Sequence, residues 1–420
     1  MEKVITFGCR LNIFESEVIK STLQEQSLED VIVFNTCSVT KEAERQAVQS
    51  IRKARKNYPD KKIIVTGCAA QINPQKYSSM REVDLVLGNE DKFIAANYSA
   101  DKLNISKEQN ILVSDIMEVE EVASHLVTAF ENKTRAFVQV QNGCNHRCTF
   151  CIIPYGRGNS RSVPVGVIAN QIRTLVDKGY KEIVFTGVDV TDYGLDLPGK
   201  PTLGQMIKRI LNLVPELSRI RLSSIDVAEI DNDLLDLIVH EPRLMPHIHI
   251  SLQAGDNMIL KRMKRRHTRE QVIEFCRKVR AQRPEVAFGA DIIAGFPTES
   301  DEMFANTLRL VSEAKIQYLH VFPYSERENT PAARMPQVDK KIRKHRAALL
   351  REIGQKELDE FSQNHIGKIV KALVETNNIG RSENFLKLYF DKEISVGSLV
   401  VARIIEYKNN QLLAEILSVL

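Results

Sequence analysis

The strongest constraint on the fold is a regular alternation of short apolar runs and helical segments that begins near Thr134. The helical segments include VIANQIRTLVDKG and REQVIEFCRKVRAQ. This alternation is typical of βα units in a parallel sheet. Six such units, fewer than the complete eightfold repeat, predict an open, partial (β/α) barrel. The six expected strands are RAFVQVQ, EIVFTG, RIRLSSI, HIHISLQ, AFGADIIAG and YLHVFPYS.

Two further regions flank this array. Residues 1–98 alternate the apolar runs KVITF, VIVFN, KIIVTG and VDLVLG with helical segments, which indicates a small doubly wound α/β domain. Residues 99–133 are rich in charge and lack a clear period, so we expect a connector. The array and the basic helix after it occupy residues 134–362. Residues 363–420 contain KIVKALVET, LKLYF, SLVVARIIEY and LLAEILSV, the pattern of a small all-β barrel.

The composition is that of an ordinary globular protein. Of the 420 residues, 43% are hydrophobic and 27% are charged, which suits two or three folded domains. The start MEKVITFGCR does not indicate a signal peptide, and no apolar run is long enough to span a membrane, so we expect a cytoplasmic protein. The formal charge of +4 is too small by itself to predict nucleic-acid binding.

Three cysteines follow the first strand of the array with the spacing C-x3-C-x2-C: Cys144, Cys148 and Cys151. In a reducing compartment, clustered cysteines are more often metal ligands or catalytic thiols than disulfides. A structural zinc site normally takes four ligands, and His146 lies between the cysteines, where it would compete for the same turn. A four-iron cluster held by three thiolates keeps one iron open for another molecule. The spacing favours a [4Fe-4S] cluster, with a three-cysteine zinc site as the alternative.

Three more cysteines, Cys9, Cys37 and Cys68, each follow an expected strand of the amino-terminal domain. The carboxyl ends of parallel strands meet at one edge of a sheet, which is where open α/β sheets bind ligands. We therefore expect the three thiols to converge on a second three-coordinate cluster. The alternative is that each is a small buried side chain. The seventh cysteine, Cys276, lies on the apolar stripe of an expected helix, so we expect it in the core.

The motif NGCNHRCTFC, with an aromatic residue before its last cysteine, resembles the radical S-adenosylmethionine (SAM) superfamily. The resemblance implies that the open iron binds SAM and that reduction of the cluster cleaves SAM to a 5′-deoxyadenosyl radical. It also implies SAM contacts from this motif and from the segments FTGVDV, ISLQAGD and GADIIAGFPTE. The residues concerned are Phe150, Gly187, Ser251, Gln253, Asp291 and Gly295.

The stretches GCRLNIFESE, FNTCSVTKEAE and TGCAAQ, with a terminal segment like a TRAM barrel, resemble the methylthiotransferases over essentially the whole chain. This resemblance implies two [4Fe-4S] clusters, the second presenting sulfur at its open iron, and two SAM molecules per turnover. NTCSVT and GVDVTDYG are most similar to the branch that acts on N6-threonylcarbamoyladenosine in tRNA. One departure is Asn329, where the family usually carries glycine; asparagine tolerates a positive φ better than most residues.

Two basic runs are candidate tRNA contacts. Either run alone is as often a solvated helix face, but two runs beside a TRAM-like barrel favour phosphate contacts with an anticodon stem-loop. The residues of the two runs are Lys261, Arg262, Lys264, Arg265, Arg266, Lys340, Lys341, Arg343 and Lys344.

These features predict an enzyme that replaces the C2 hydrogen of N6-threonylcarbamoyladenosine, next to the anticodon at position 37, with a methylthio group. The expected reductant is an electron donor such as flavodoxin or ferredoxin. The same chemistry on N6-isopentenyladenosine or on a ribosomal protein is one alternative. Another is a non-catalytic two-cluster RNA-binding or electron-transfer protein. Two open irons argue against simple electron transfer, which usually uses fully ligated clusters.

Overall fold

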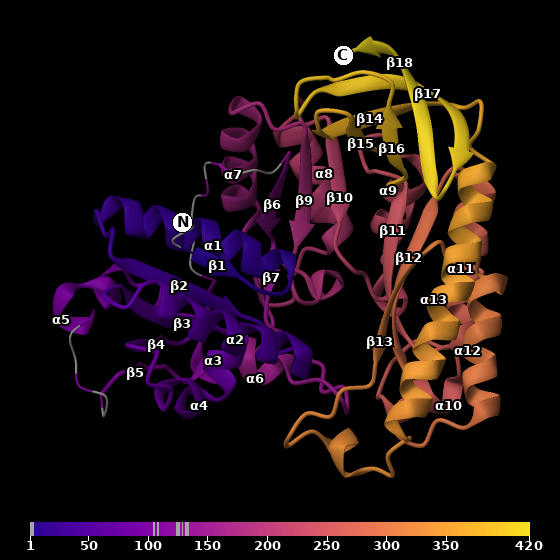
Figure 1. Cartoon of the computed structure of the whole chain (residues 1–420). Helices are drawn as coiled ribbons and strands as arrows, with labels where there is room; N and C mark the ends of the chain where they lie inside the picture. Colours follow the sequence, from indigo (N-terminus) through magenta and orange to yellow (C-terminus); the bar gives the residue numbers. More distant parts are fainter. Residues whose placement is uncertain (1–3, 104–105, 107–108, 123–126, 128, 131–133) are drawn as a thin grey trace.

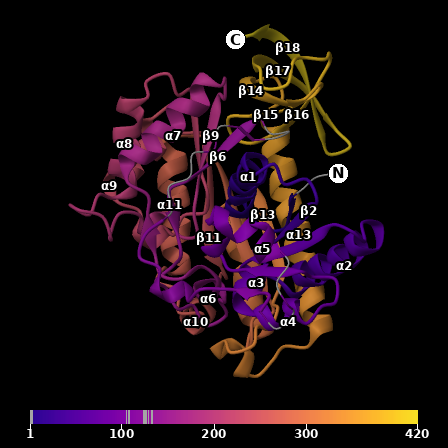
Figure 2. The same cartoon turned by 90° about the vertical axis from the view of Figure 1, so that its left-hand side faces the viewer.

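The computed structural model describes residues 4–420 except 104–105, 107–108, 123–126, 128 and 131–133 (Figure 1). An amino-terminal α/β domain, a central array of parallel strands and a carboxyl-terminal closed barrel follow one another along the chain. In Figures 1 and 2 the terminal barrel lies at one end of the array, and the amino-terminal domain lies beside the strands.

The amino-terminal sheet consists of parallel strands in consecutive order. They are β1 (Val4–Thr6), β2 (Val31–Thr36), β3 (Lys62–Gly67), β4 (Leu85–Leu87) and β5 (Ile111–Leu112). Val31 and Val33 pack with helix α1 (Arg10–Glu25), whereas Ile32 and Phe34 pack with α2 (Lys41–Asn57) on the other face. Helices therefore cover both faces of the sheet, and β5 carries the sheet past residue 98 into the segment expected to be a connector.

Short helices complete this domain and the segment after it. They are α3 (Cys68–Ile72), α4 (Pro74–Ser78), α5 (Ala100–Leu103) and the 3-10 turns η1 (Asp91–Phe93), η2 (Ala95–Tyr98) and η3 (Ile116–Glu118).

The central array contains all six expected strands: β6 (Arg135–Gln139), β9 (Glu182–Thr186), β10 (Arg219–Leu222), β11 (His247–Gln253), β12 (Ala287–Ala294) and β13 (Tyr318–Pro323). They form two three-stranded parallel sheets, joined by bridges from Ile220 to Leu244 and from Ile225 to Ile250. Among the described residues, β6 and β13 do not pair, so the barrel stays open between its first and last strands, as the repeat predicted.

The strands of the array are connected mainly by helices. These are α6 (Ile153–Arg157), α7 (Val165–Asp177), α8 (Leu203–Leu213), α9 (Asn232–His240), α10 (Asn257–Arg262), α11 (Arg269–Gln282) and α12 (Asp301–Glu313). A short hairpin, β7 (Gln141–Asn142) with β8 (Arg161–Ser162), and the turns η4 (Val190–Asp192), η5 (Val227–Glu229) and η6 (Pro331–Arg334) complete it.

One large core fills the space between the strands and the helices. Cys276 on α11 is fully buried in it, as the apolar stripe predicted. Phe14 and Val18 of α1 belong to the same core, so the amino-terminal domain and the array share apolar contacts. Asn329, in the loop after β13, has a φ of 66°, the positive value that a glycine would accept freely.

The carboxyl-terminal unit is a closed five-stranded barrel reached through the long helix α13 (Lys340–Gln363). Four strands match the expected runs: β14 (Ile369–Thr376), β16 (Lys387–Phe390), β17 (Leu399–Lys408) and β18 (Gln411–Val419). The sequence did not predict the remaining strand, β15 (Ile379–Ser382), because four residues that include Gly380 make no apolar run.

The loop between β15 and β16 closes the amino-terminal end of the strand array. The Phe385 ring stacks on His247 with the centroids 4.7 Å apart. The guanidinium groups of Arg135, Arg221 and Arg381 lie over the same ring, at 5.4, 4.9 and 4.5 Å from its centroid. Because these contacts seal one end of the array, the carboxyl ends of the strands are left as the open end.

A buried ion network supports this sealed end. Glu182, at the start of β9, is fully buried and accepts hydrogen bonds from Arg221 (2.6 Å) and Arg135, with Arg219 at 3.2 Å. Burial alone would raise the pKa of Glu182, but the three guanidinium groups lower it to about 2. The carboxylate therefore stays ionised and paired with these arginines.

Candidate active site

The first group of thiols, Cys144, Cys148 and Cys151, lies in the loop after β7, at the open end of the array. The loop is held by the Cys144 N–H donating to the Gly158 carbonyl (3.1 Å) and the Cys151 N–H donating to the Cys148 carbonyl (3.0 Å). The thiols lie close enough to act on one another electrostatically. Burial, with the Cys148 thiol, raises the pKa of Cys151 to about 12. Thiols of such high pKa lose their protons when a metal binds.

The second group, Cys9, Cys37 and Cys68, is assembled from three strand ends. Cys9 precedes α1, Cys37 follows β2, and Cys68 begins α3. Their charges also act on one another, and burial, with the Cys68 thiol, raises the pKa of Cys37 to about 12. Gly8 has a φ of 95°, and a Cβ there would lie 2.6 Å from the Cys37 sulfur. Only glycine leaves room for this arrangement.

A buried ion network adjoins the second group. Arg157, on α6 of the array, binds Glu15 with Nη1 to Oε1 at 2.6 Å and Nη2 to Oε2 at 3.1 Å. Lys92 also binds Glu15, at 2.7 Å. All three side chains are at most 2% exposed. Burial alone would raise the pKa of Glu15, but Arg157 and then Lys92 lower it to about 2. The network holds two cations for one carboxylate, so it leaves positive charge beside the thiols.

The same segment of chain connects the two groups of thiols. Gly156 packs against Cys68, since a Cβ at Gly156 would lie 3.2 Å from the Cys68 Cβ. Asn89 donates one hydrogen bond to the Gly156 carbonyl, and its amide lies 3.8 Å from the Cys68 sulfur. The residues that follow Cys151 therefore form a wall of the second site.

Arg265 and His146 surround the first group of thiols with polar contacts. Arg265 donates to the Cys148 sulfur (3.6 Å), the Asp226 carboxylate (2.7 Å) and the Ser251 carbonyl (2.9 Å). His146 lies 3.0 Å from Asp189 and 3.3 Å from Glu229. The hydrogen bond to Asp189, followed by that to Glu229, raises the pKa of His146 to about 10. The His146 imidazole is thus paired with two carboxylates beside the thiols.

Two adjoining cavities occupy the open end of the array. The smaller, about 280 Å³, is lined by Phe150, Cys151, Gln253 and Asp291. The larger, about 510 Å³, is lined by residues that include Cys9, Cys37 and Gly187. Both cavities share Val39, Thr40 and Phe322 in their walls. Each group of thiols therefore opens into a cavity, and the cavities meet.

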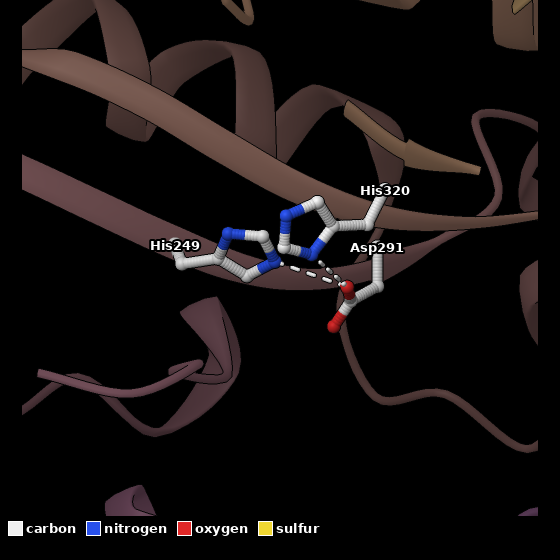
Figure 3. A group of neighbouring side chains, drawn as sticks. All are labelled: His249, Asp291 and His320. Carbon is white, nitrogen blue, oxygen red and sulfur yellow. Dashed lines mark hydrogen bonds and ion pairs between the residues drawn. The ribbon is translucent and has the colours of Figure 1, made fainter. Parts of the chain in front are cut away.

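His249, Asp291 and His320 form a cluster on β11, β12 and β13 (Figure 3). Asp291 Oδ1 lies 3.1 Å from His249 Nε2 and 3.2 Å from His320 Nδ1. Burial alone would raise the pKa of Asp291, but the two imidazoles hold it well below its usual range. Asp291 lines the smaller cavity, and both histidines line the larger one.

Two other residues expected to contact SAM make protein contacts instead of lining these cavity walls. The Ser251 carbonyl accepts from Arg265. Gly295 has a φ of 69°, and a Cβ there would lie 2.6 Å from the Arg343 side chain. Gly295 thus makes room for Arg343.

The residues of the two basic runs divide into exposed lysines and arginines with protein partners. Arg262 donates to Thr298, and Arg343 is buried and donates to Glu326. Arg266 binds Glu229 beside the first group of thiols. The lysines Lys261, Lys264, Lys340, Lys341 and Lys344 are exposed, and so is Arg266.

Sequence reasoning missed the network of Glu15, Lys92 and Arg157 and the partners of His146. The only signal for Arg157 was its position six residues after Cys151, in PYGRG, and nothing local relates it to Glu15. Glu15 and Arg157 meet only through the contact between the amino-terminal domain and the array.

The fold agrees with the comparisons. The pattern of the Radical SAM superfamily matches residues 138–311, and that of the uncharacterized protein family UPF0004 matches residues 2–88. Among solved structures, the fold is similar to that of the radical S-adenosylmethionine methyltransferase TsrM from Kitasatospora setae, with a TM-score of 0.57 and 13% sequence identity. The superposition covers 79% of this chain and 75% of TsrM. The protein is thus a radical SAM enzyme, which uses SAM and a [4Fe-4S] cluster.

Sequence relatives define the family within this class. Threonylcarbamoyladenosine tRNA methylthiotransferase MtaB of Rickettsia prowazekii is 61% identical over 404 residues, 96% of this chain and 94% of the relative. The protein of that name in Aquifex aeolicus is 38% identical over 94% of this chain and 98% of its own. A tRNA-2-methylthio-N(6)-dimethylallyladenosine synthase of Carboxydothermus hydrogenoformans is 32% identical, with 96% of each chain covered. The chain belongs to the tRNA methylthiotransferase family of radical SAM enzymes.

None of the described helices combines the length and the apolar character needed to cross a membrane.

Proposed function

We propose that the protein adds a methylthio group to C2 of N6-threonylcarbamoyladenosine at position 37 of tRNA. The observation that carries this proposal is the pair of thiol groups, each opening into one of two adjoining cavities. A methylthiotransferase needs one centre that starts radical chemistry and another that presents sulfur to the same base. The 61% identity to a relative named for threonylcarbamoyladenosine supports this substrate over the isopentenyl alternative.

The donor sets fit two clusters. Cys144, Cys148 and Cys151 would hold the [4Fe-4S] cluster that takes SAM, because three thiolates leave one iron open. SAM would occupy the smaller cavity, against Phe150 and Gln253. When bound, this cluster and SAM supply the radical that removes the C2 hydrogen. Arg265 holds one side of the site through its contacts with Cys148 and Asp226.

Cys9, Cys37 and Cys68 would hold the second [4Fe-4S] cluster, which would present the sulfur, and a second SAM molecule would supply the methyl group. A cluster with three thiolates carries net negative charge, and the surplus cation of the Arg157, Lys92 and Glu15 network lies beside it. The network therefore offsets charge that would otherwise be buried without compensation.

The remaining partners follow from the chemistry. The exposed lysines of the two basic runs, such as Lys261 and Lys340, would contact phosphates of the anticodon stem-loop. The target base must leave the stack of the loop to enter the larger cavity. A flavodoxin or ferredoxin would reduce the first cluster, in the cytoplasm where the tRNA is found.

Nucleoside analysis of tRNA tests the substrate directly. A strain lacking the protein should lose 2-methylthio-N6-threonylcarbamoyladenosine and keep its unmethylthiolated precursor. Wild-type protein should restore the nucleoside, and a variant with Cys144, Cys148 and Cys151 changed to Ala should not. Loss of the methylthiolated isopentenyladenosine instead would assign the isopentenyl substrate.

A further inference from the structure

The larger cavity is where a threonylcarbamoyl group would be recognised, if the substrate is the one proposed above. Its wall includes Cys9 and Cys37, and it adjoins the cavity of Cys151. A base attacked from one site and given sulfur from the other must lie where the two cavities meet. Its N6 substituent then faces the remaining walls of the larger cavity. Those walls include Arg10, His249 and His320.

Arg10 is the cation in this wall whose charge lacks a partner. It is the first residue of α1 and is half-buried. Among the described residues its guanidinium has neither a hydrogen bond nor an ion pair, although five N–H groups are available. A partly desolvated guanidinium without an acceptor is costly unless a ligand supplies one.

The carboxylates that act on Arg10 through space are committed elsewhere. They are Asp291 and Glu182. Asp291 lies against His249 and His320, at 3.1 and 3.2 Å (Figure 3). Glu182 is enclosed by the three arginines of the sealed end. Arg10 is therefore the cation left over for a ligand.

His320 offers a second, different contact. Its side chain is 59% exposed, and its Nδ1 faces Asp291. Because an ionised carboxylate only accepts hydrogen bonds, the proton that faces Asp291 is on Nδ1, and Nε2 is the ring atom left to accept a hydrogen bond. Among the described residues Nε2 has no donor. The wall thus combines one free cation with one free acceptor.

We infer that Arg10 binds the carboxylate of the threonylcarbamoyl group and that His320 accepts a hydrogen bond from an N–H or hydroxyl of the same group. A guanidinium matches a carboxylate with two parallel hydrogen bonds, which fixes the position of the group as well as its charge. An isopentenyl group offers neither partner, so it would leave Arg10 desolvated and unpaired. Sites of this kind discriminate strongly against analogues that lack the polar group.

SAM and the tRNA backbone also carry anions, so the experiment must separate three sources of negative charge. Reconstituted enzyme is given anticodon stem-loops that carry threonylcarbamoyladenosine or its methyl ester, which keeps the shape and removes the charge. We expect Arg10→Gln to lower kcat/KM on the acid roughly 100-fold and on the ester by no more than about threefold. RNA-independent formation of 5′-deoxyadenosine and the affinity for an unmodified stem-loop should stay within about twofold of wild type.

Equal losses on acid and ester would overturn the inference, as would a loss of SAM cleavage or of affinity for the unmodified stem-loop. Because Arg10 follows Cys9, the iron content is measured as well. An Arg10→Gln protein that loses about half of its iron would assign Arg10 to the cluster and also overturn the inference.

His320→Phe is a second variant, in the wall of the same cavity and outside both groups of thiols. It should keep full iron content and lose roughly tenfold in kcat/KM on both stem-loops, because acid and ester share the N–H and hydroxyl groups. Unchanged kinetics would remove His320 from the proposal. Failure of the wild-type enzyme on the acid stem-loop is a separate result, since it rejects the substrate itself, whatever the variants do.

Discussion

The two groups of thiols reach similar donor sets by different routes. Cys144, Cys148 and Cys151 lie within one loop, whose backbone hydrogen bonds hold the thiols together. Cys9, Cys37 and Cys68 come from three strand ends of another domain, and Arg157 of the array completes their surroundings. The first site is thus a property of one segment, and the second is a property of the assembled molecule. Variants that separate these two kinds of site test the difference.

The largest expected effect comes from removing the thiols group by group. With Cys144, Cys148 and Cys151 changed to Ala, we expect about four of about eight irons to remain and the formation of 5′-deoxyadenosine to stop. With Cys9, Cys37 and Cys68 changed to Ala, the iron content should fall equally, but SAM cleavage should persist while methylthio transfer ends. Iron analysis and product assays with dithionite measure both. Cleavage by the first variant would refute the assignment of the radical site.

Arg157 tests whether the second site depends on contacts between domains. Arg157→Gln breaks a fully buried ion pair, so we expect a loss of about 3 kcal/mol in the free energy of unfolding, together with weaker iron retention by the second group. The measurement is urea unfolding, with iron analysis in a background that lacks the first group of thiols. Lys76→Gln is the matched control, because it breaks an exposed pair with Glu44 (2.8 Å) and should cost less than about 1 kcal/mol. Equal effects would contradict the role of burial.

Gly8 tests how far the second group of thiols depends on the local backbone. Gly8→Ala forces a positive φ on a residue with a side chain and places its Cβ against Cys37. We expect the free energy of unfolding to fall by about 2 kcal/mol. We also expect iron to be lost from the second group of thiols alone. Gly179→Ala carries the same backbone strain, with a φ of 91°, but its Cβ would meet nothing. This variant should lower the free energy of unfolding by about 1 kcal/mol and leave the iron content unchanged. Iron loss in Gly179→Ala would show that strain, rather than contact with the thiol, is responsible.

The smallest expected effect is a loss of stability at acidic pH. Glu15 has a pKa of about 2 in the folded protein, below its ordinary value of 4.5. Its contribution to stability is therefore fully present above pH 4.5 and is lost as the pH falls towards 2. Between pH 4.5 and 3, the free energy of unfolding of the wild-type apoprotein should fall by about 1.6 kcal/mol more than that of Glu15→Gln, because each pKa unit corresponds to about 1.4 kcal/mol and the unfolded group is partly protonated across this range. Urea titrations across this range measure both, and parallel losses would count against a charged Glu15.

Local patterns predicted much of the architecture. The six strands of the array and the core position of Cys276 follow from apolar periodicity, which a single segment contains. The convergence of Cys9, Cys37 and Cys68 followed from a topological rule about parallel strands. β15 was missed because its four residues carry no such period.

Contacts across the fold were not predictable in this way. Arg265 and Arg343 belong to basic runs that suggested RNA binding, yet their guanidinium groups contact Cys148 and Glu326. A run of charges records composition, and it does not show which members point inward. Likewise, Glu15 and Arg157 are 142 residues apart in sequence, and no local signal relates their charges.

The position of Arg157 also sets an order of events during biosynthesis. Cys9, Cys37 and Cys68 leave the ribosome well before Arg157, so a nascent chain has all three thiols while the neighbouring cation is still missing. Glu15 and Lys92 then form only part of the network, and the α6 wall beside Cys68 is not yet in place. The mature second site therefore comes into being only after the first thiol loop has been synthesised and docked. Iron delivered to the amino-terminal thiols before that point meets an open and electrostatically incomplete site.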